Sequence, residues 1–268
     1  MKAAGKIIVV TGSGSGIGRE ITLLLLSKGS KVAGIDLNGA ALAETARLAG
    51  NDATGFESIV ASIADRHVVE RLPEQVCSRF GTVDGVINNA GIIQPFVGIN
   101  ALDYLTIERV LNVNLLGTLY VTKTFLPYLL KRPEAHIVNL SSMGGFVPVP
   151  GQTIYCAAKA GVKLFTEGLA SELIDSNVRV TVVFPGAIAT NIMANSGVGA
   201  SSSGSQPRGS SKPLPARDAA EIIVRGMERN VHHVFVGRDS VLMNLLHRLN
   251  PRFAARMIAN QMKGVVQN

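Results

Sequence analysis

The chain has 268 residues, of which 47% are hydrophobic and 17% are charged, and its formal net charge is +7. This length and composition exclude a disordered chain or a small scaffold and predict a packed globular body. The longest apolar runs, such as residues 23–26, are far shorter than the ~20 residues of a membrane span, and the first apolar run lacks a cleavage site, so we expect a strand there and no signal peptide.

The positive charge is confined to two segments. Residues 187–217 hold three basic side chains and residues 240–268 hold four, and neither segment holds an acidic one. The rest of the chain is balanced, and it has no basic stripe with interleaved aromatic residues that would track phosphates and stack bases. We therefore expect no nucleic-acid partner.

Short β-branched runs alternate along the chain with longer segments of helical period, which is typical of βαβ units. The predicted strands are 6–11, 31–36, 54–59, 83–88, 135–141, 178–184 and 233–236. The predicted helices are 16–28, 39–50, 65–79, 103–131 with a break, 152–175 and 217–229. The pattern predicts an α/β fold, a single Rossmann-type doubly wound domain over residues 1–268 with about seven parallel strands flanked by helices.

Two segments interrupt this alternation. Residues 195–215 are rich in Gly, Ser and Pro, and we predict that 187–217 forms a mobile substrate loop at the carboxyl ends of the strands, with an interdomain linker as the alternative. Asn250-Pro251 predicts a helix start within a basic amphipathic C-terminal extension over 240–268. Such a helix either makes peripheral contact with a membrane or packs on its own fold or a sister subunit.

A glycine-rich segment connects the first predicted strand to the first helix. Gly12, Gly16 and Gly18 fit the pattern T-G-x-x-x-G-x-G, whereas strict G-x-G-x-x-G fails at Ile17. Glycines let the backbone approach a pyrophosphate, whose charge is then met by the N–H groups and dipole of the helix N-terminus. The segment therefore predicts a dinucleotide cofactor.

Asp36 ends the second strand, 20 residues beyond Gly16. An acid at about this distance accepts hydrogen bonds from the adenosine ribose and repels a 2'-phosphate. Ser15 also leaves the loop without a basic residue directly before Gly16. The sequence therefore favours NAD over NADP.

Tyr155 and Lys159 are four residues apart at the start of a predicted helix, so their side chains share one face. A phenol with a pKa near ~10 is a weak base at neutral pH, but a lysine ammonium beside it stabilises the phenolate. Ser142 ends the fifth strand 13 residues before the tyrosine, where a hydroxyl can hold a carbonyl oxygen. These three residues predict acid–base chemistry at a carbonyl or carbinol.

With these motifs the sequence resembles the short-chain dehydrogenase/reductase family over nearly its whole length. Residues 88–91 match the family's N-N-A-G element, Asn114 matches its proton-relay asparagine, and residues 185–190 match its P-G-x-x-x-T segment. The cofactor-binding residues implied by the resemblance are Gly12, Gly16, Ile17, Gly18, Asp36, Leu37, Ser62, Ile63, Asn89, Ala90, Tyr155, Lys159, Ile188 and Thr190.

The resemblance implies hydride transfer between NAD and a secondary alcohol or ketone, with oxidation as the expected direction. Tyr155 would exchange the proton and Ser142 would hold the substrate oxygen. Lys159 would tune the tyrosine, and Asn114 would pass protons to solvent. The alternatives are an NADPH-dependent carbonyl reductase and a non-catalytic cofactor-sensing protein, against which the intact Ser142, Tyr155 and Lys159 argue.

One position departs from the family pattern. The family usually places an acid or amide after the third strand to contact the adenine amino group, and Ser62 stands there in this chain. Asp65 would take that place if the loop shifts by a few residues.

The expected walls of the substrate pocket carry no charge. Residues 88–102, 139–154 and 184–207 offer Ile92, Ile93, Phe96, Met143, Phe146, Val147, Val149, Ile188, Ile192 and Met193, with Gln94 and Gln152 as neutral polar groups. This composition predicts a neutral, apolar substrate that is sterol-like or aliphatic. Arg208 and Lys212 leave open a phosphate or coenzyme A tail.

The remaining expectations concern partners and location. The resemblance implies a homodimer or homotetramer formed through the helices near 103–131 and 152–175. Cys77 and Cys156 are expected to be reduced thiols in a cytoplasmic protein, and the five scattered histidines show no metal-ligand spacing. We therefore expect no metal site.

Overall fold

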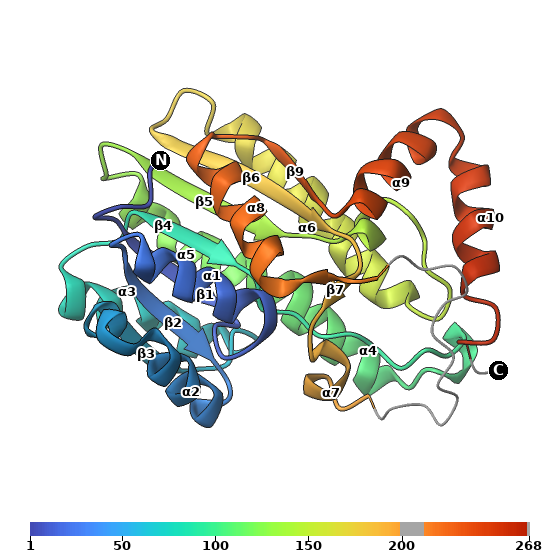
Figure 1. Ribbon diagram of the computed structural model, residues 1–268, viewed down its shortest axis with the longest axis horizontal. Coiled ribbons are helices and arrows are strands. Elements are labelled where there is room, and N and C mark those ends of the chain that lie inside the picture. Colours follow the sequence, from blue (N-terminus) through green and yellow to red (C-terminus); the bar gives the residue numbers. More distant parts are fainter. Residues whose placement is uncertain (199–211, 267–268) are drawn as a thin grey trace.

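The computed structural model describes residues 1–198 and 212–266 and is built around one seven-stranded sheet (Figure 1). Its strands are β1 (Ile7–Thr11), β2 (Lys31–Asp36), β3 (Phe56–Val60), β4 (Gly85–Asn88), β5 (Ala135–Leu140), β6 (Val178–Pro185) and β9 (His233–Val236). They lie in the order β3-β2-β1-β4-β5-β6-β9, and every neighbouring pair is parallel. The seven predicted strands and the doubly wound Rossmann-type fold are therefore confirmed, with the order reversing between β1 and β4.

Helices cover both faces of the sheet because its strands are apolar on both faces. In β1, Ile8 and Val10 join a core with α1 (Gly16–Ser27) and α8 (Ala216–Glu228). Ile7 and Val9, which alternate with them, join a second core with the other layer of helices. That layer consists of α3 (Arg66–Phe80), α5 (Gly117–Leu129) and α6 (Thr153–Glu172), while α2 (Gly39–Ala49) packs beside α1.

The predicted break in the helix at 103–131 is a short π-helical segment. Helix α4 (Tyr104–Leu111) is followed by the π turn η3 (Asn112–Leu116), and α5 begins directly after it. π turns inside helices are frequent at functional sites. Here the turn contains Asn114, which is buried.

The C-terminal extension is a hairpin of two helices, α9 (Arg238–Leu249) and α10 (Pro251–Gln261), of which only the second was predicted. Helix α9 buries only Ser240 and Met243. Its sequence therefore lacks the stripe of buried apolar residues from which a helix that packs on a core is predicted. Ala254 and Ile258 of α10 pack with Met243 against residue Val147 of the loop after β5. The buried side of the extension therefore packs on its own fold.

The segment 187–217 is described only in part. Strands β7 (Ile188–Ala189) and β8 (Leu214–Pro215) pair with each other, and a short helix α7 (Ile192–Asn195) follows β7. Residues 199–211, which hold Arg208 and the middle of the predicted mobile loop, lie outside the described residues. The prediction of a mobile substrate loop therefore stays a prediction.

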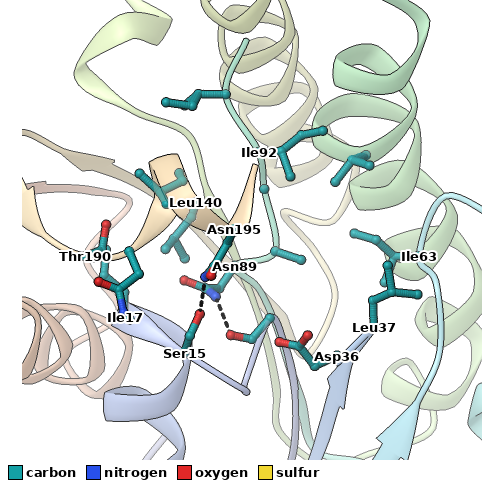
Figure 2. Close-up of a pocket in the computed structure, with 18 of the residues that line it drawn as sticks. Ser15, Ile17, Asp36, Leu37, Ile63, Asn89, Ile92, Leu140, Thr190 and Asn195 are labelled. Atoms are coloured by element: carbon teal, nitrogen blue, oxygen red, sulfur yellow. Dashed lines mark hydrogen bonds between the residues drawn. The ribbon is translucent and has the colours of Figure 1, made fainter. Parts of the chain in front are cut away.

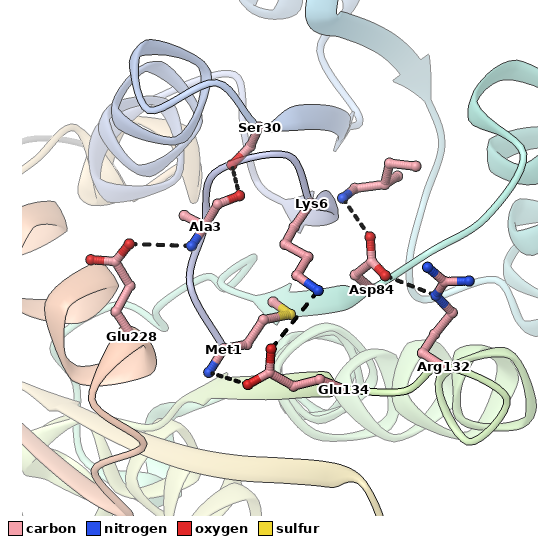
Figure 3. Close-up of polar contacts among 9 residues, drawn as sticks. Met1, Ala3, Lys6, Ser30, Asp84, Arg132, Glu134 and Glu228 are labelled. Atoms are coloured by element: carbon pink, nitrogen blue, oxygen red, sulfur yellow. Dashed lines mark hydrogen bonds and ion pairs between the residues drawn. The ribbon is translucent and has the colours of Figure 1, made fainter.

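Hydrogen bonds and ion pairs of charged groups connect the amino ends of the strands, at the edge of the sheet opposite the predicted site (Figure 3). The buried Asp84 carboxylate accepts hydrogen bonds from the Ile7 N–H at 2.9 Å and from Arg132 Nε at 2.8 Å. The N-terminal ammonium of Met1 lies 3.3 Å from Glu134 Oε1.

Within residues 1–198 and 212–266, no helix combines the length and hydropathy that a bilayer crossing requires.

Candidate active site

A cavity of about 830 Å³ opens at the carboxyl ends of the strands, at the switch point between β1 and β4 (Figure 2). Fourteen of the predicted site residues line it, namely Gly12, Gly16, Ile17, Asp36, Leu37, Ser62, Ile63, Asn89, Ala90, Ser142, Tyr155, Lys159, Ile188 and Thr190. Gly18 and Asn114 do not line the cavity. Both lie directly behind its wall, because Gly18 contacts Gly12 and Asn114 contacts Gly91, and these two glycines line the cavity.

The glycine loop brings the backbone close to the cavity. Gly12 and Gly16 have φ angles of +69° and +52°, which side-chain-bearing residues rarely adopt. A Cβ atom on Gly18 would lie 2.0 Å from the Gly12 carbonyl oxygen, so Gly18 is required for packing of the loop on α1. The N-cap residue Ser15 does not bond to α1 with its side chain, so the first N–H groups of that helix are available to an anion.

A later segment of the chain reaches across to this loop. Asn195 Nδ2 at the end of α7 donates a hydrogen bond of 2.8 Å to Ser15 Oγ, and Figure 2 shows this contact at the cavity. Thr190 lies against Gly16, where a Cβ atom would meet its methyl group at 3.2 Å. The segment after β6 therefore packs against the glycine loop at this end of the cavity.

The Asp36 carboxylate is held at the end of β2 by backbone groups. Its Oδ2 accepts from the Gly14 N–H and its Oδ1 from the Asn38 N–H, both at 2.9 Å. The neighbouring Arg19 guanidinium does not line the cavity, because it donates to Gly14 O, Ala41 O and Thr45 Oγ1. The Asp36 carboxylate therefore faces this end of the cavity, and none of the described residues that line this end carries a positive charge.

Ser62 and Ile63 line the same end of the cavity, as predicted. Asp65, the alternative to Ser62, is instead the N-cap of α3, and its Oδ1 accepts from the N–H groups of His67 and Val68 at 2.9 and 3.2 Å. The described lining thus offers a serine hydroxyl where the family pattern has an acid or amide.

Ser142, Tyr155 and Lys159 meet at the other end of the cavity. The Ser142 hydroxyl lies near enough to the Tyr155 phenol to act on its pKa, and Lys159 Nζ lies 5.8 Å from the centre of the tyrosine ring. Both side chains flank Gly144, where a Cβ atom would lie 3.5 Å from Ser142 Oγ and from Tyr155 Cε1. The three residues predicted from their spacing are therefore brought together in space.

Burial controls the protonation of this group. Burial raises the pKa of Tyr155 to about 12, and the nearby Ser142 hydroxyl acts in the opposite direction. Burial also lowers the pKa of Lys159 to about 8, and its Nζ donates to Leu140 O at 2.9 Å. Lys159 is not among the groups that shift the pKa of Tyr155 here, and the expectation that it lowers this pKa stays a prediction.

Asn114 holds the loop that follows β4. Its Oδ1 accepts from the Ile92 N–H at 3.0 Å, and its Nδ2 donates to the carbonyl oxygens of Ile92 and Val110. A Cβ atom on Gly91 would lie 2.6 Å from Asn114 Oδ1 and 3.3 Å from Lys159 Nζ. Asn114 is therefore placed next to Lys159, with Gly91 as the small residue between them.

Gln94 has a structural position that sequence reasoning missed. It was expected to face the substrate, but it is fully buried, and its Oε1 accepts from the N–H groups of Ile154 and Tyr155 at 2.9 and 3.1 Å. Gln152 is also buried and donates to Gln94 O. Gln94 thus satisfies the first turn of α6 and fixes the backbone of Tyr155.

Nine of the ten apolar residues expected around the substrate divide into two groups, and the tenth, Met193, lies in neither and is exposed. Ile92, Ile93, Ile188 and Ile192 line the cavity, as predicted. In contrast, Phe96, Met143, Phe146, Val147 and Val149 pack in the apolar cluster beneath the C-terminal hairpin. The sequence shows that these side chains are apolar, but it does not show that the hairpin covers them.

A doubly wound sheet with a cavity at its switch point is typical of nucleotide-binding α/β proteins. A family model described as short chain dehydrogenase matches residues 6–199. A protein of Mycobacterium tuberculosis described as an oxidoreductase, SadH, is 35% identical over 264 residues, which are 95% of this chain and 94% of that protein. The chain therefore belongs to the short-chain dehydrogenase/reductase family and is an oxidoreductase of that family.

Two solved structures show the same fold. A short-chain dehydrogenase/reductase of Burkholderia phymatum, solved in complex with NAD, aligns with a TM-score of 0.85 at 24% identity over 94% of this chain and 96% of that one. A short-chain dehydrogenase of Burkholderia cenocepacia, solved in complex with NADP, aligns with a TM-score of 0.80 at 23% identity over 96% and 99% of the two chains. Both cofactors thus occur on this fold.

Proposed function

We propose that this protein is an NAD-dependent dehydrogenase that interconverts a neutral, apolar secondary alcohol and its ketone. The observation that carries the proposal is one cavity with a ribose-level carboxylate, Asp36, at one end and the Ser142-Tyr155-Lys159 group at the other. The intact group argues against a non-catalytic cofactor sensor. The glycine loop between them fits a pyrophosphate, because its glycines leave room for one and the N-terminus of α1 faces it.

Each residue then has a distinct task. Bound NAD would supply or accept the hydride at its nicotinamide ring. Tyr155 gives its phenol proton to the ketone oxygen in reduction and takes it back in oxidation. Ser142 donates to that oxygen, and Lys159 holds its positive charge beside the tyrosine. Asn114 holds Gly91 in place, and this glycine leaves room for the Lys159 side chain.

The pH dependence of the rate in each direction should follow the tyrosine pKa. Because burial raises the pKa of Tyr155 to about 12, the phenol carries its proton at neutral pH, and reduction needs no prior deprotonation. Oxidation requires the phenolate, whose fraction increases tenfold per pH unit below that pKa. The rate of oxidation should therefore rise with pH more steeply than the rate of reduction.

The cofactor choice is tested at Asp36. Replacing Asp36→Ala removes a charged acceptor for the ribose, so NAD should bind about 10- to 100-fold more weakly, while NADP should bind more tightly because the repulsion of its phosphate is lost. Asp52→Ala, at an exposed residue after α2, is the matched control and should change neither affinity. If wild type binds NADP better than NAD, the protein is instead an NADPH-dependent carbonyl reductase.

The substrate class is tested with purified protein and both cofactors. The isoleucines at positions 92, 93, 188 and 192 of the cavity favour neutral aliphatic or sterol-like ketones over charged ones. Turnover of anionic acyl-coenzyme A ketones with no turnover of neutral ketones would show that this substrate class is wrong. The homo-oligomer, the cytoplasmic location and the single domain stay predictions that size measurement, cell fractionation and limited proteolysis would test.

A further inference from the structure

The C-terminal hairpin exposes an apolar stripe that the cavity does not use. Val241, Leu242, Leu245 and Leu249 of α9 are each more than half exposed. Their spacing places them on one side of the helix, because successive residues advance by about 100° around the axis. Phe253, just after the turn into α10, is also more than half exposed. Soluble surfaces rarely gather large apolar side chains in this way.

Basic side chains accompany the stripe. Arg248 is exposed on α9, Arg252 and Arg256 are exposed on α10, and Lys263 follows that helix. No acidic residue occurs between residues 240 and 268. The turn of the hairpin therefore presents leucine, phenylalanine and arginine together, and Figure 1 shows this turn standing out from the body at the β9 end of the sheet.

We propose that the α9–α10 hairpin docks this protein onto the surface of a phospholipid bilayer that contains anionic headgroups. A second copy of the chain is the other candidate occupant. A two-fold self-contact would place the four cations of residues 240–268 against the same four of its partner, and these residues hold no carboxylate that would offset them. An anionic bilayer takes up the apolar side chains and attracts the arginines, so both features of the hairpin have a partner there.

The hairpin is joined to the site, so docking would orient the cavity. Ser240 Oγ donates to Phe184 O at 2.7 Å, and Asp239 Oδ2 accepts from the Ala187 N–H at 2.7 Å. These contacts fix the start of α9 to the loop that carries Ile188 and Thr190 into the cavity wall. The docking itself does not depend on the proposed substrate.

The test is a flotation assay with full-length protein and two vesicle types, phosphatidylcholine alone and phosphatidylcholine mixed with phosphatidylserine. Wild type should float with the mixed vesicles, and raising the salt concentration should weaken this binding. The double variant Arg248→Gln with Arg252→Gln removes two positive charges and should lower the partition coefficient about thirtyfold. Leu245→Ser with Leu249→Ser should lower it by at least on the order of tenfold.

Matched controls separate docking from folding and from catalysis. Arg71→Gln on α3 and Leu48→Ser on α2 change exposed residues of the same types away from the hairpin, and they should bind vesicles like wild type. All variants should keep their Tm and their turnover of a water-soluble ketone. The proposal is overturned if wild type does not float with mixed vesicles, or if the hairpin variants float equally well. It is also overturned if the hairpin variants lose only self-association, measured by sedimentation velocity without lipid.

Discussion

The hydrogen bonds of Gln94 place Tyr155, the proposed acid and base, by satisfying the first turn of its helix. Replacing Gln94→Met keeps a similar volume but leaves the buried N–H groups of Ile154 and Tyr155 without their acceptor. Two unpaired N–H groups cost about 2–6 kcal/mol. The Gln94 amide nitrogen itself has no partner among the described residues, and its removal offsets about 1–3 kcal/mol of that cost. We therefore expect a loss of about 2 kcal/mol in the free energy of unfolding, measured in urea.

The kinetic effect should exceed what the stability loss explains. A freer first turn of α6 lets the Tyr155 phenol move relative to Ser142, and a displacement of about 1 Å can cost about 100-fold in rate. We expect kcat to fall about 10- to 100-fold at a temperature where the variant is folded, with the Kd of the cofactor changed little. Stopped-flow turnover and cofactor titration measure these two quantities separately.

Two further variants make the test specific. Gln152→Met removes a neighbouring buried amide that donates to Gln94 O but does not bond to α6 with its side chain, so it should cost stability and leave kcat near wild type. Gln94→Glu keeps an acceptor at the helix N-terminus, and its negative charge should shift the pH dependence of oxidation upward by disfavouring the Tyr155 phenolate. Equal kcat values for Gln94→Met and Gln152→Met would refute the positioning role.

Two other predictions concern stability. Burial lowers the pKa of His136 to about 3 from 6.5, so below pH 6.5 the unfolded chain binds a proton that the folded chain does not, and stability should fall by up to about 4–5 kcal/mol as the pH decreases to 3. In His136→Gln the urea midpoint should depend less on pH over this range, and an unchanged dependence would contradict this cause. Arg132→Met leaves the buried Asp84 carboxylate with the Ile7 N–H alone, and it should lower the free energy of unfolding by about 2–3 kcal/mol. Because this ion pair lies at the opposite edge of the sheet, a change in kcat would contradict the prediction.

The fold could be predicted from the sequence because its signals are local. Each strand is a short β-branched run and each connecting helix has its own period, so the seven strands follow from neighbouring residues. The parts of the cavity that follow strand ends were also predictable, since Asp36, Ser142 and the 155–159 pair stand where parallel strands and helices converge. Element ends moved by one to three residues, as at β3 and β4.

What the sequence could not provide depends on contacts between distant segments. Gln94 meets the N-terminus of α6 across 60 residues of chain, and Asn195 reaches Ser15 across 180. Nothing in the local pattern distinguishes a glutamine that faces a ligand from one that supports a helix. In the same way, the apolar side chains of Phe146 and Val147 are covered by the C-terminal hairpin, whose first helix buries too few residues to show a core-facing stripe.

The most direct test of the proposed chemistry follows one hydride and one proton. Purified protein is incubated with NADH carrying deuterium at C4 and with a panel of neutral apolar ketones, and the products are analysed by mass spectrometry. We predict deuterium at the carbinol carbon with wild type, and none with Tyr155→Phe, which should still bind NADH in a fluorescence titration. Transfer that persists in Tyr155→Phe, or NADH binding without transfer to any ketone by wild type, would contradict the account.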